Sequence, residues 1–240
     1  MYQDNNQPAT PPPFYGGKAV AQQANSIMKR VYVRMFIGML ISAFCALGVA
    51  SSPSMLAFFF SNRLMYWLLF GVMLVMAIAI PARLNRMSTG SVMIAFCLFS
   101  ALMGVSLAPI FIVYRIGTIV YTFFITAGVF GAMSVYGYFT KQDLTKVGSF
   151  LVMALFGLFF VMIVNIFAKS SQLDWIISIV GVVIFIGLTA WDTQNVKKLA
   201  RYNMDPALAD KLATMSAMNL YLDFINMFLF LLRIFGNSND

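Results

Sequence analysis

The chain has 240 residues, of which 61% are hydrophobic and 10% are charged, and its formal net charge is +8. A soluble globular domain carries about 25% charged residues, so this composition excludes an ordinary soluble domain and predicts a membrane protein. The sequence contains no His, which excludes Ser-His-Asp and Cys-His catalysis and HExxH zinc sites.

The basic excess does not indicate a nucleic-acid partner, because the Lys and Arg residues fall in short loops between hydrophobic runs. The two cysteines, Cys45 and Cys97, lie in different hydrophobic runs and lack the number and spacing of a metal site or a disulfide framework. We interpret both as small hydrophobic core residues. The sequence therefore predicts no cofactor.

The N-terminal segment 1–28 is rich in Pro, Gly, Gln and Asn and shows no apolar periodicity. Such a segment cannot bury enough apolar surface to fold, so we expect a disordered tail. It also lacks the charged region and apolar core of a signal peptide. Residues 29–237 are expected to form the membrane domain.

Seven apolar runs follow the tail, each long enough to cross a hydrocarbon core of about 30 Å. They predict an all-α membrane protein, a bundle of seven transmembrane helices. Pro109 in the third run is expected to kink its helix. Small residues in the third and fourth runs, including Gly104 and Gly131, favour close helix packing. The runs are 35–52, 64–81, 91–113, 116–139, 147–168, 174–194 and 214–235.

The connection 195–213 is the longest and is expected to contain a short interfacial helix.

The Lys and Arg residues are distributed unequally between the two sides of the membrane, and this bias predicts the orientation. One side has Lys18, Lys29, Arg30, Arg34, Arg83, Arg86, Lys141, Lys146, Lys197, Lys198, Arg201 and Lys211, and the other has Arg63, Arg115, Lys169 and Arg233. We expect a multi-pass membrane protein with a cytoplasmic N-terminus and a C-terminus outside.

Two aspartates, Asp192 and Asp223, lie inside the sixth and seventh runs. A carboxylate at membrane depth costs about 2.5–3.5 kcal/mol on insertion scales, so each is a candidate functional residue. Both lie on polar helix faces, which must contact protein or a water-filled cavity because lipid offers polar groups no partner. One face carries Thr189, Asp192 and Asn195, and the other carries Ser216, Asn219, Asp223 and Asn226.

The predicted orientation places Asp192 near the cytoplasmic boundary and Asp223 roughly 14 Å deeper along its helix. A tilt or an extension of the sixth helix would bring the two acids together, and Arg86 on the same side could reach them by snorkelling. The alternative is that Asp192 is an ordinary interfacial charge beside Lys197 and Lys198.

If the acids meet, they are expected to share a proton. Losing that proton leaves two charges that repel each other or admit a cation. Asp192 and Asp223 are then transient metal ligands, assisted by the side-chain oxygens of Asn219 and Asn226. Ca²⁺ prefers 6–8 oxygen ligands, so this set suits passage better than storage.

The segments Gly187–Gln194 and Leu220–Asn226 resemble the two signature regions of the Bax inhibitor-1 family, most closely its bacterial branch. Three further segments support the resemblance, which covers roughly residues 25–237: Gly104–Ile110, Phe130–Ser134 and Leu231–Gly236.

The resemblance implies a seven-helix fold with the last helix at its centre. It also implies a pH-sensitive calcium leak channel in which an aspartate pair senses protons and bonds to an arginine. These residues map onto Asp192, Asp223 and Arg86, with Arg83 one helical turn from Arg86.

Two other roles are weighed against the channel. Some bacterial relatives modulate a membrane-anchored AAA protease, and a tail that such a partner grips would suit that role without any transport. An intramembrane aspartyl protease would also use two membrane acids. The Gly-x-Gly-Asp motif of that class is absent before Asp223, and Pro206-Ala207-Leu208 precedes this acid instead of following it. We therefore predict that the chain is not an enzyme. Its expected partners are the lipid bilayer, Ca²⁺ or other cations, and, in the alternative role, such an AAA protease.

Overall fold

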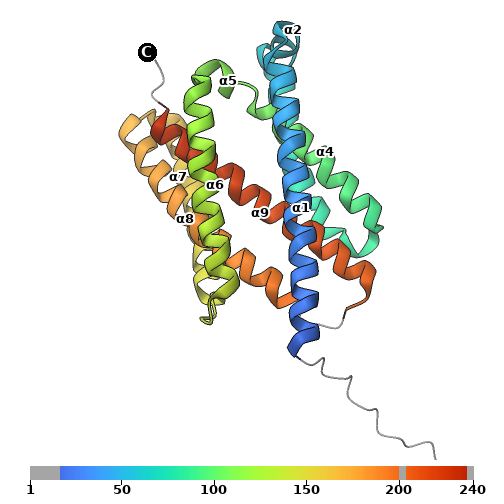
Figure 1. The fold of residues 1–240 in the computed structure, drawn as a ribbon. Helices are drawn as coiled ribbons and strands as arrows, with labels where there is room; N and C mark the ends of the chain where they lie inside the picture. The colour runs from blue at the N-terminus through green and yellow to red at the C-terminus, as the bar shows by residue number, and fades with distance from the viewer. Residues whose placement is uncertain (1–16, 200–203, 237–240) are drawn as a thin grey trace, which may run out of the picture.

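The computed structural model describes residues 17–199 and 204–236, and every regular element within those ranges is a helix. Figure 1 shows the helices gathered in one bundle, with α1 beginning at one end and α9 ending at the other. In chain order they are α1 (Gly17–Ala50), α2 (Pro53–Leu56), the π-helix η1 (Ala57–Ser61), α3 (Arg63–Ala82), the 3-10 helix η2 (Leu84–Arg86), α4 (Thr89–Leu107), α5 (Ile110–Val113), α6 (Ile116–Phe139), α7 (Thr145–Ala168), α8 (Ser171–Leu199) and α9 (Pro206–Phe235).

Seven segments of the described chain are long and apolar enough to cross a membrane, which confirms the predicted number of spans. The predicted break in the third span is also confirmed. There α4 ends at Leu107 and α5 begins at Ile110, with Pro109 between them. Large hydrophobic side chains cover the outside of the bundle, as a lipid-facing surface requires. The chain is therefore a multi-pass helical membrane protein.

Two predicted boundaries differ from the structure. Helix α1 begins at Gly17 and Ile27 is buried, so part of the predicted tail is helical, while residues 1–16 lie outside the described ranges. The connection 195–213 is also shorter than predicted, because α8 continues to Leu199 and α9 starts at Pro206. Asp205 caps that start by accepting hydrogen bonds from the backbone N–H groups of the first turn. The expected interfacial helix is therefore the beginning of α9.

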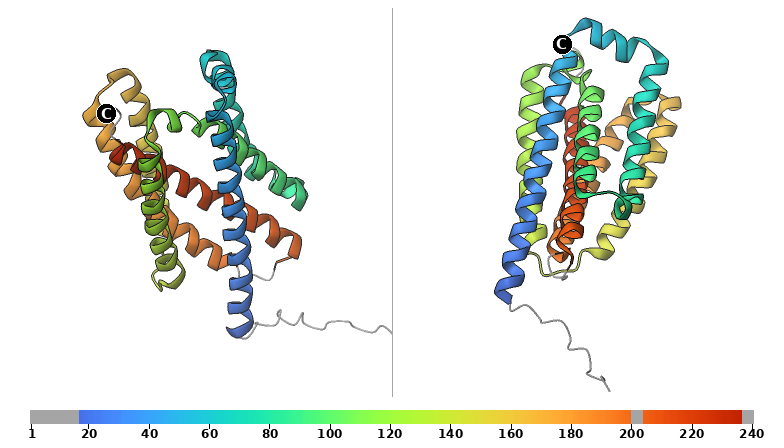
Figure 2. Two further views of the ribbon diagram at one scale, coloured as in Figure 1. Left: turned by 45° about the horizontal axis from the view of Figure 1, so that its top comes forward. Right: turned by 90° about the vertical axis from the view of Figure 1, so that its right-hand side faces the viewer.

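Helix α9 is the central helix, as predicted, and crosses the bundle obliquely (Figures 1 and 2). It packs against α1, α4, α6 and α8, and it is the most buried of the seven spans. Its fully buried side chains include Leu220, Tyr221 and Met227. This enclosure buries Thr214 and Asp223, two polar residues of α9, away from lipid.

Small residues let α1 and α4 approach closely where they meet α9. A Cβ atom added to Gly104 would overlap the backbone oxygen of Ser42. The Ser42 hydroxyl lies 2.7 Å from the backbone oxygen of Ser100 and 2.7 Å from the Tyr221 hydroxyl, so it joins three helices. The expectation of close packing is confirmed for Gly104 and is wrong for Gly131, where an added Cβ meets no atom within 4 Å. The helix α6 faces open space there.

Gly104→Ala should destabilise the bundle, whereas Gly131→Ala should not. The added methyl group at position 104 meets backbone, which cannot rotate away, and such overpacking costs about 1–3 kcal/mol. The same methyl group at position 131 meets nothing. Thermal unfolding of both variants in the same detergent measures the difference, and equal midpoints would contradict the proposed close contact.

Candidate functional site

A cavity of about 360 Å³ lies between α7, α8 and α9 and holds the polar residues that the sequence singled out. It brings Asp192 and Asp223 together with Asn219 and Asn226. Its polar lining is Asp192, Asn195, Ser216, Asn219, Asp223 and Asn226, and its apolar lining is Val152, Leu155, Phe185, Leu188, Leu222 and the ring of Trp191. Three helices thus line one polar chamber in the apolar bundle, and Asn219 in that lining is exposed.

Asp223 is the most enclosed of these polar residues, with 5% of its surface exposed. Its Oδ2 atom is buried and has no hydrogen-bond partner among the described residues. Asn226, one turn further along α9, donates its amide to the backbone oxygen of Leu222 at 2.8 Å. An ionised carboxylate in such a position is costly unless a proton or a cation neutralises it.

Asp192 is half-buried in the α8 wall of the cavity, where Asn195 lies one turn further along the same helix. It lies close enough to Asp223 for the two charges to interact. The sequence left a gap in depth between these acids. That gap closes because α8 runs about 10 Å beyond Asp192 by helical rise, and because α9 is oblique.

The two lysines near the end of α8 have other partners, so the structure does not support an interfacial pairing for Asp192. Lys197 donates to the backbone oxygen of Tyr138 and lies over its ring. Lys198 pairs with Asp143, and hydrogen bonds from Lys198 and Thr145 lower the pKa of Asp143 from 3.8 to about 2. This depressed pKa means that the pair stabilises the folded chain above the ordinary carboxyl range and loses that effect as the pH falls towards 2.

Arg86 is not brought to the aspartate pair in this conformation. It ends the helix η2 on the exposed surface, beyond α3, and it is not among the residues that line the cavity. Within the described ranges, the lining contains no Lys or Arg at all. The charge of the aspartate pair therefore has no fixed positive partner inside the cavity.

The same three helices enclose a second polar cavity, of about 460 Å³, towards the opposite end of the bundle. Its lining includes Asp174, Asn165 and Arg233, and Arg233 approaches Asp174 at 3.7 Å. Asp174 and Asp192 are separated by roughly 27 Å of helical rise along α8, close to the thickness of the hydrocarbon core. The two polar cavities therefore lie at two depths of one helix layer.

An apolar cluster separates the two cavities. At its centre the rings of Phe185 on α8 and Phe230 on α9 stack, with centroids 6.0 Å apart, and Gly181 lets the Phe230 ring lie against α8. The rest of the cluster is Leu151, Leu158, Ile177, Ile184, Leu188, Met227 and Leu231. Packed apolar side chains therefore occupy the level between the two polar cavities.

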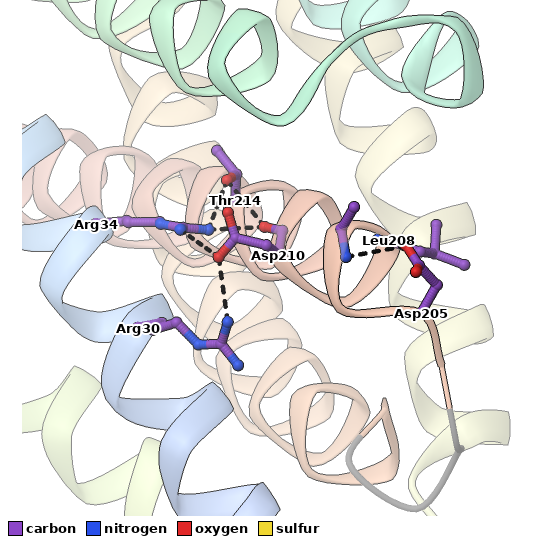
Figure 3. A network of polar contacts seen from close by, with 7 residues as sticks. Arg30, Arg34, Asp205, Leu208, Asp210 and Thr214 are labelled. Atoms are coloured by element: carbon purple, nitrogen blue, oxygen red, sulfur yellow. Dashed lines mark hydrogen bonds and ion pairs between the residues drawn. The ribbon is translucent and has the colours of Figure 1, made fainter.

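A network of charged residues holds the first turns of α9 against α1 (Figure 3). Arg34 donates to the Asp210 carboxylate and to the Thr214 hydroxyl, at 2.5 and 2.8 Å, and Arg30 reaches the same carboxylate at 3.2 Å. The Arg34 and Asp210 side chains are only 17% and 20% exposed, so these charge-assisted bonds are partly shielded from water. The network fixes the end of α9 that precedes the aspartate cavity.

Sequence reasoning missed this network and the stacked rings. A signal for the network was present, because Asp205-Pro206 is a typical helix start and places Asp210 and Thr214 one turn apart on the same helix. Recognising that start would have moved Asp210 from a loop into α9. No comparable signal identified Phe185 and Phe230, since apolar residues surround both of them in sequence.

The sequence of the chain matches a known protein family and several bacterial proteins. The family model described as "Inhibitor of apoptosis-promoting Bax1" matches residues 24–240. The chain is 43% identical over 212 residues to the inner membrane protein YbhL of Escherichia coli, a match that covers 88% of this chain and 91% of the relative. It is 44% identical over 217 residues to an uncharacterized protein of Borreliella burgdorferi, covering 90% and 94% of the two chains. A Rickettsia prowazekii protein is 38% identical over 213 residues, covering 89% and 90%.

Proposed function

The chain belongs to the Bax inhibitor-1 family, and we propose that it forms a cation leak across a bacterial inner membrane, controlled by the charge state of Asp192 and Asp223. The seven spans and the similarity to an inner membrane protein support this location. The Lys and Arg bias supports a cytoplasmic N-terminus and a C-terminus on the opposite side. In that orientation the aspartate cavity belongs to the cytoplasmic half of the bundle.

One observation carries the proposal: two carboxylates from different helices line one cavity, and no basic side chain of the described residues lines it with them. Two unpaired carboxylates cannot both stay ionised in a membrane interior without a compensating charge. A fixed arginine would supply that charge permanently. Without one, the compensation comes from a proton or from a cation that enters the cavity, so the state of the pair depends on pH.

The cavity suits a passing cation better than a stored one. Within residues 17–199 and 204–236, no group of three or more His, Cys, Asp or Glu residues is placed to hold a metal ion. The two carboxylates and the side-chain oxygens of Asn219 and Asn226 offer a hard cation such as Ca²⁺ part of its preferred 6–8 oxygens, and water supplies the rest. Weak binding of this kind allows an ion to leave again.

The stacked rings of Phe185 and Phe230 are the proposed gate. They lie between the aspartate cavity and the Asp174–Arg233 cavity, and the apolar cluster around them excludes water. Conduction requires α8 and α9 to separate at this level. A change in charge on Asp192 and Asp223 acts on these same two helices, and this couples the proposed sensor to the proposed gate.

Asp223→Asn should abolish the pH dependence of cation flux. An amide keeps the shape and hydrogen-bonding capacity of the carboxylate but does not titrate between pH 5 and pH 9. The measurement is Ca²⁺ entry into proteoliposomes that contain a calcium dye, scanned over pH. Asp205→Asn is the matched control, because it removes another carboxylate, at the start of the same helix, while Asn still caps that helix. A pH response in Asp223→Asn equal to that of the wild type would place the sensor elsewhere.

Phe230→Ala should raise the basal flux severalfold, because it removes one of the two stacked rings of the gate. Phe228→Ala is the control, since Phe228 is as buried on α9 but contacts the α1 and α6 side. Each substitution removes the same buried ring, so a general loss of stability affects both variants alike. Equal flux through the two variants in the proteoliposome assay would reject the gate.

A further inference from the structure

A groove of about 790 Å³ lies between α1 and α6, on the side of α9 away from the aspartate cavity. Phe224 of α9 forms its floor, and Figure 1 shows α9 passing behind the two helices that flank the groove. Its walls include Met35 and Met39 from α1 and Phe130 and Gly131 from α6. The volume lies within the range of ligand pockets, about 300–1,000 Å³.

The groove has the length of one membrane leaflet. Along α1 it extends from Asn25 to Met39, roughly 21 Å by helical rise. A bilayer with its headgroups is about 40–45 Å thick, so one leaflet is about half of that. A separate apolar cavity of about 320 Å³ occupies the rest of the gap, and the two cavities share Met39 and Phe224 as a common wall. A helix that crosses the whole membrane fits this divided gap less well than a molecule confined to one leaflet.

Polar groups gather at the end of the groove where α1 begins. Lys29 is exposed there, and its ammonium group is in no ion pair with any described residue. Nearby, the Tyr138 hydroxyl donates to the Asn25 side chain at 2.7 Å. A basic residue above an apolar groove, at the level of the membrane surface, complements an anionic headgroup with its acyl chain below.

An unpartnered hydroxyl further down the groove is a second, independent indication of a ligand. Ser134 is 7% exposed and lines the groove, and its Oγ atom has no hydrogen-bond partner within the described ranges. Buried hydroxyls elsewhere in this bundle, such as those of Ser100 and Thr189, donate to the backbone oxygen four residues earlier. A buried polar atom without a partner calls for an explanation, and a ligand oxygen supplies one.

We propose that this groove binds one anionic phospholipid from the leaflet at the α1 end of the bundle. The phosphate pairs with Lys29, the glycerol ester oxygens accept a hydrogen bond from Ser134, and an acyl chain lies against Phe224 and Phe130. In the orientation proposed above, this leaflet is the cytoplasmic one. The lipid site is independent of the cation path, because it lies on the other face of α9 and uses none of the residues of the aspartate cavity.

Two substitutions test the two parts of the site. Gly131→Leu fills the groove with a side chain whose Cβ meets no protein atom within 4 Å. Lys29→Gln removes the positive charge and leaves the groove open. Gly157→Leu on α7 is the matched control for the first, since an added Cβ there also meets nothing. Lys146→Gln is the control for the second, because Lys146 is exposed near the start of α7 and lines neither the groove nor the aspartate cavity.

The measurement is native mass spectrometry of the delipidated full-length protein, titrated with phosphatidylglycerol or phosphatidylethanolamine of identical acyl chains. The wild type should bind one phosphatidylglycerol, about fivefold more tightly than phosphatidylethanolamine, as expected for one basic residue at the surface. Gly131→Leu should lose most of the binding of both lipids. Lys29→Gln should bind both lipids equally, and the two controls should match the wild type.

Three results would overturn the proposal. Undiminished phosphatidylglycerol binding by Gly131→Leu would place the lipid elsewhere on the surface. Equal binding of the two lipids by the wild type would remove the role of the charge. A co-purified polypeptide that is lost in Gly131→Leu, in place of a bound lipid, would mean that a protein helix occupies the groove.

Discussion

The carboxylate of Asp223 is buried in the central helix, and one of its oxygens meets no hydrogen-bond donor from the described residues. A charge at this depth costs several kcal/mol, so the group is stable only with a proton, a cation or a partner residue. The surrounding helices reduce this cost in two ways. Four helices pack against α9 and keep Asp223 away from lipid, while Asp192 and several amide side chains give it a polar cavity. The absence of a basic residue from the described lining leaves the remaining compensation to mobile ions.

The face of α9 opposite Asp223 lies against an apolar groove instead of a polar cavity. Asp223 faces the cavity between α7 and α8, whereas the next residue, Phe224, forms the floor of the groove between α1 and α6. One helix therefore separates a polar chamber from an apolar groove that is open towards the lipid. The charged network of Arg34 and Asp210 anchors the start of this helix on α1. If α9 moves at the proposed gate, we expect it to pivot about this anchored end.

Much of this arrangement could be predicted from the sequence. Seven apolar runs and the spacing of polar residues in the last two predicted the spans and the polar faces, because lipid excludes polar groups from the outer surface of a bundle. Contacts between helices were harder to predict. Asp210 was assigned to a loop because its charge interrupts the apolar pattern, although it lies in α9 and pairs across the bundle. Phe185 and Phe230 have no sequence feature that distinguishes rings packed against each other from rings that face lipid.

The central claim is that Asp192 and Asp223 act as one titrating unit, and a double-mutant cycle tests it most directly. Asp192→Asn, Asp223→Asn and the double variant are compared with the wild type by the midpoint and amplitude of the pH dependence of Ca²⁺ flux. Groups in contact show interaction energies of about 0.5–3 kcal/mol. The account predicts that either single substitution removes most of the pH response and that the second adds little. Strictly additive effects would show that the two aspartates titrate separately and would contradict the account.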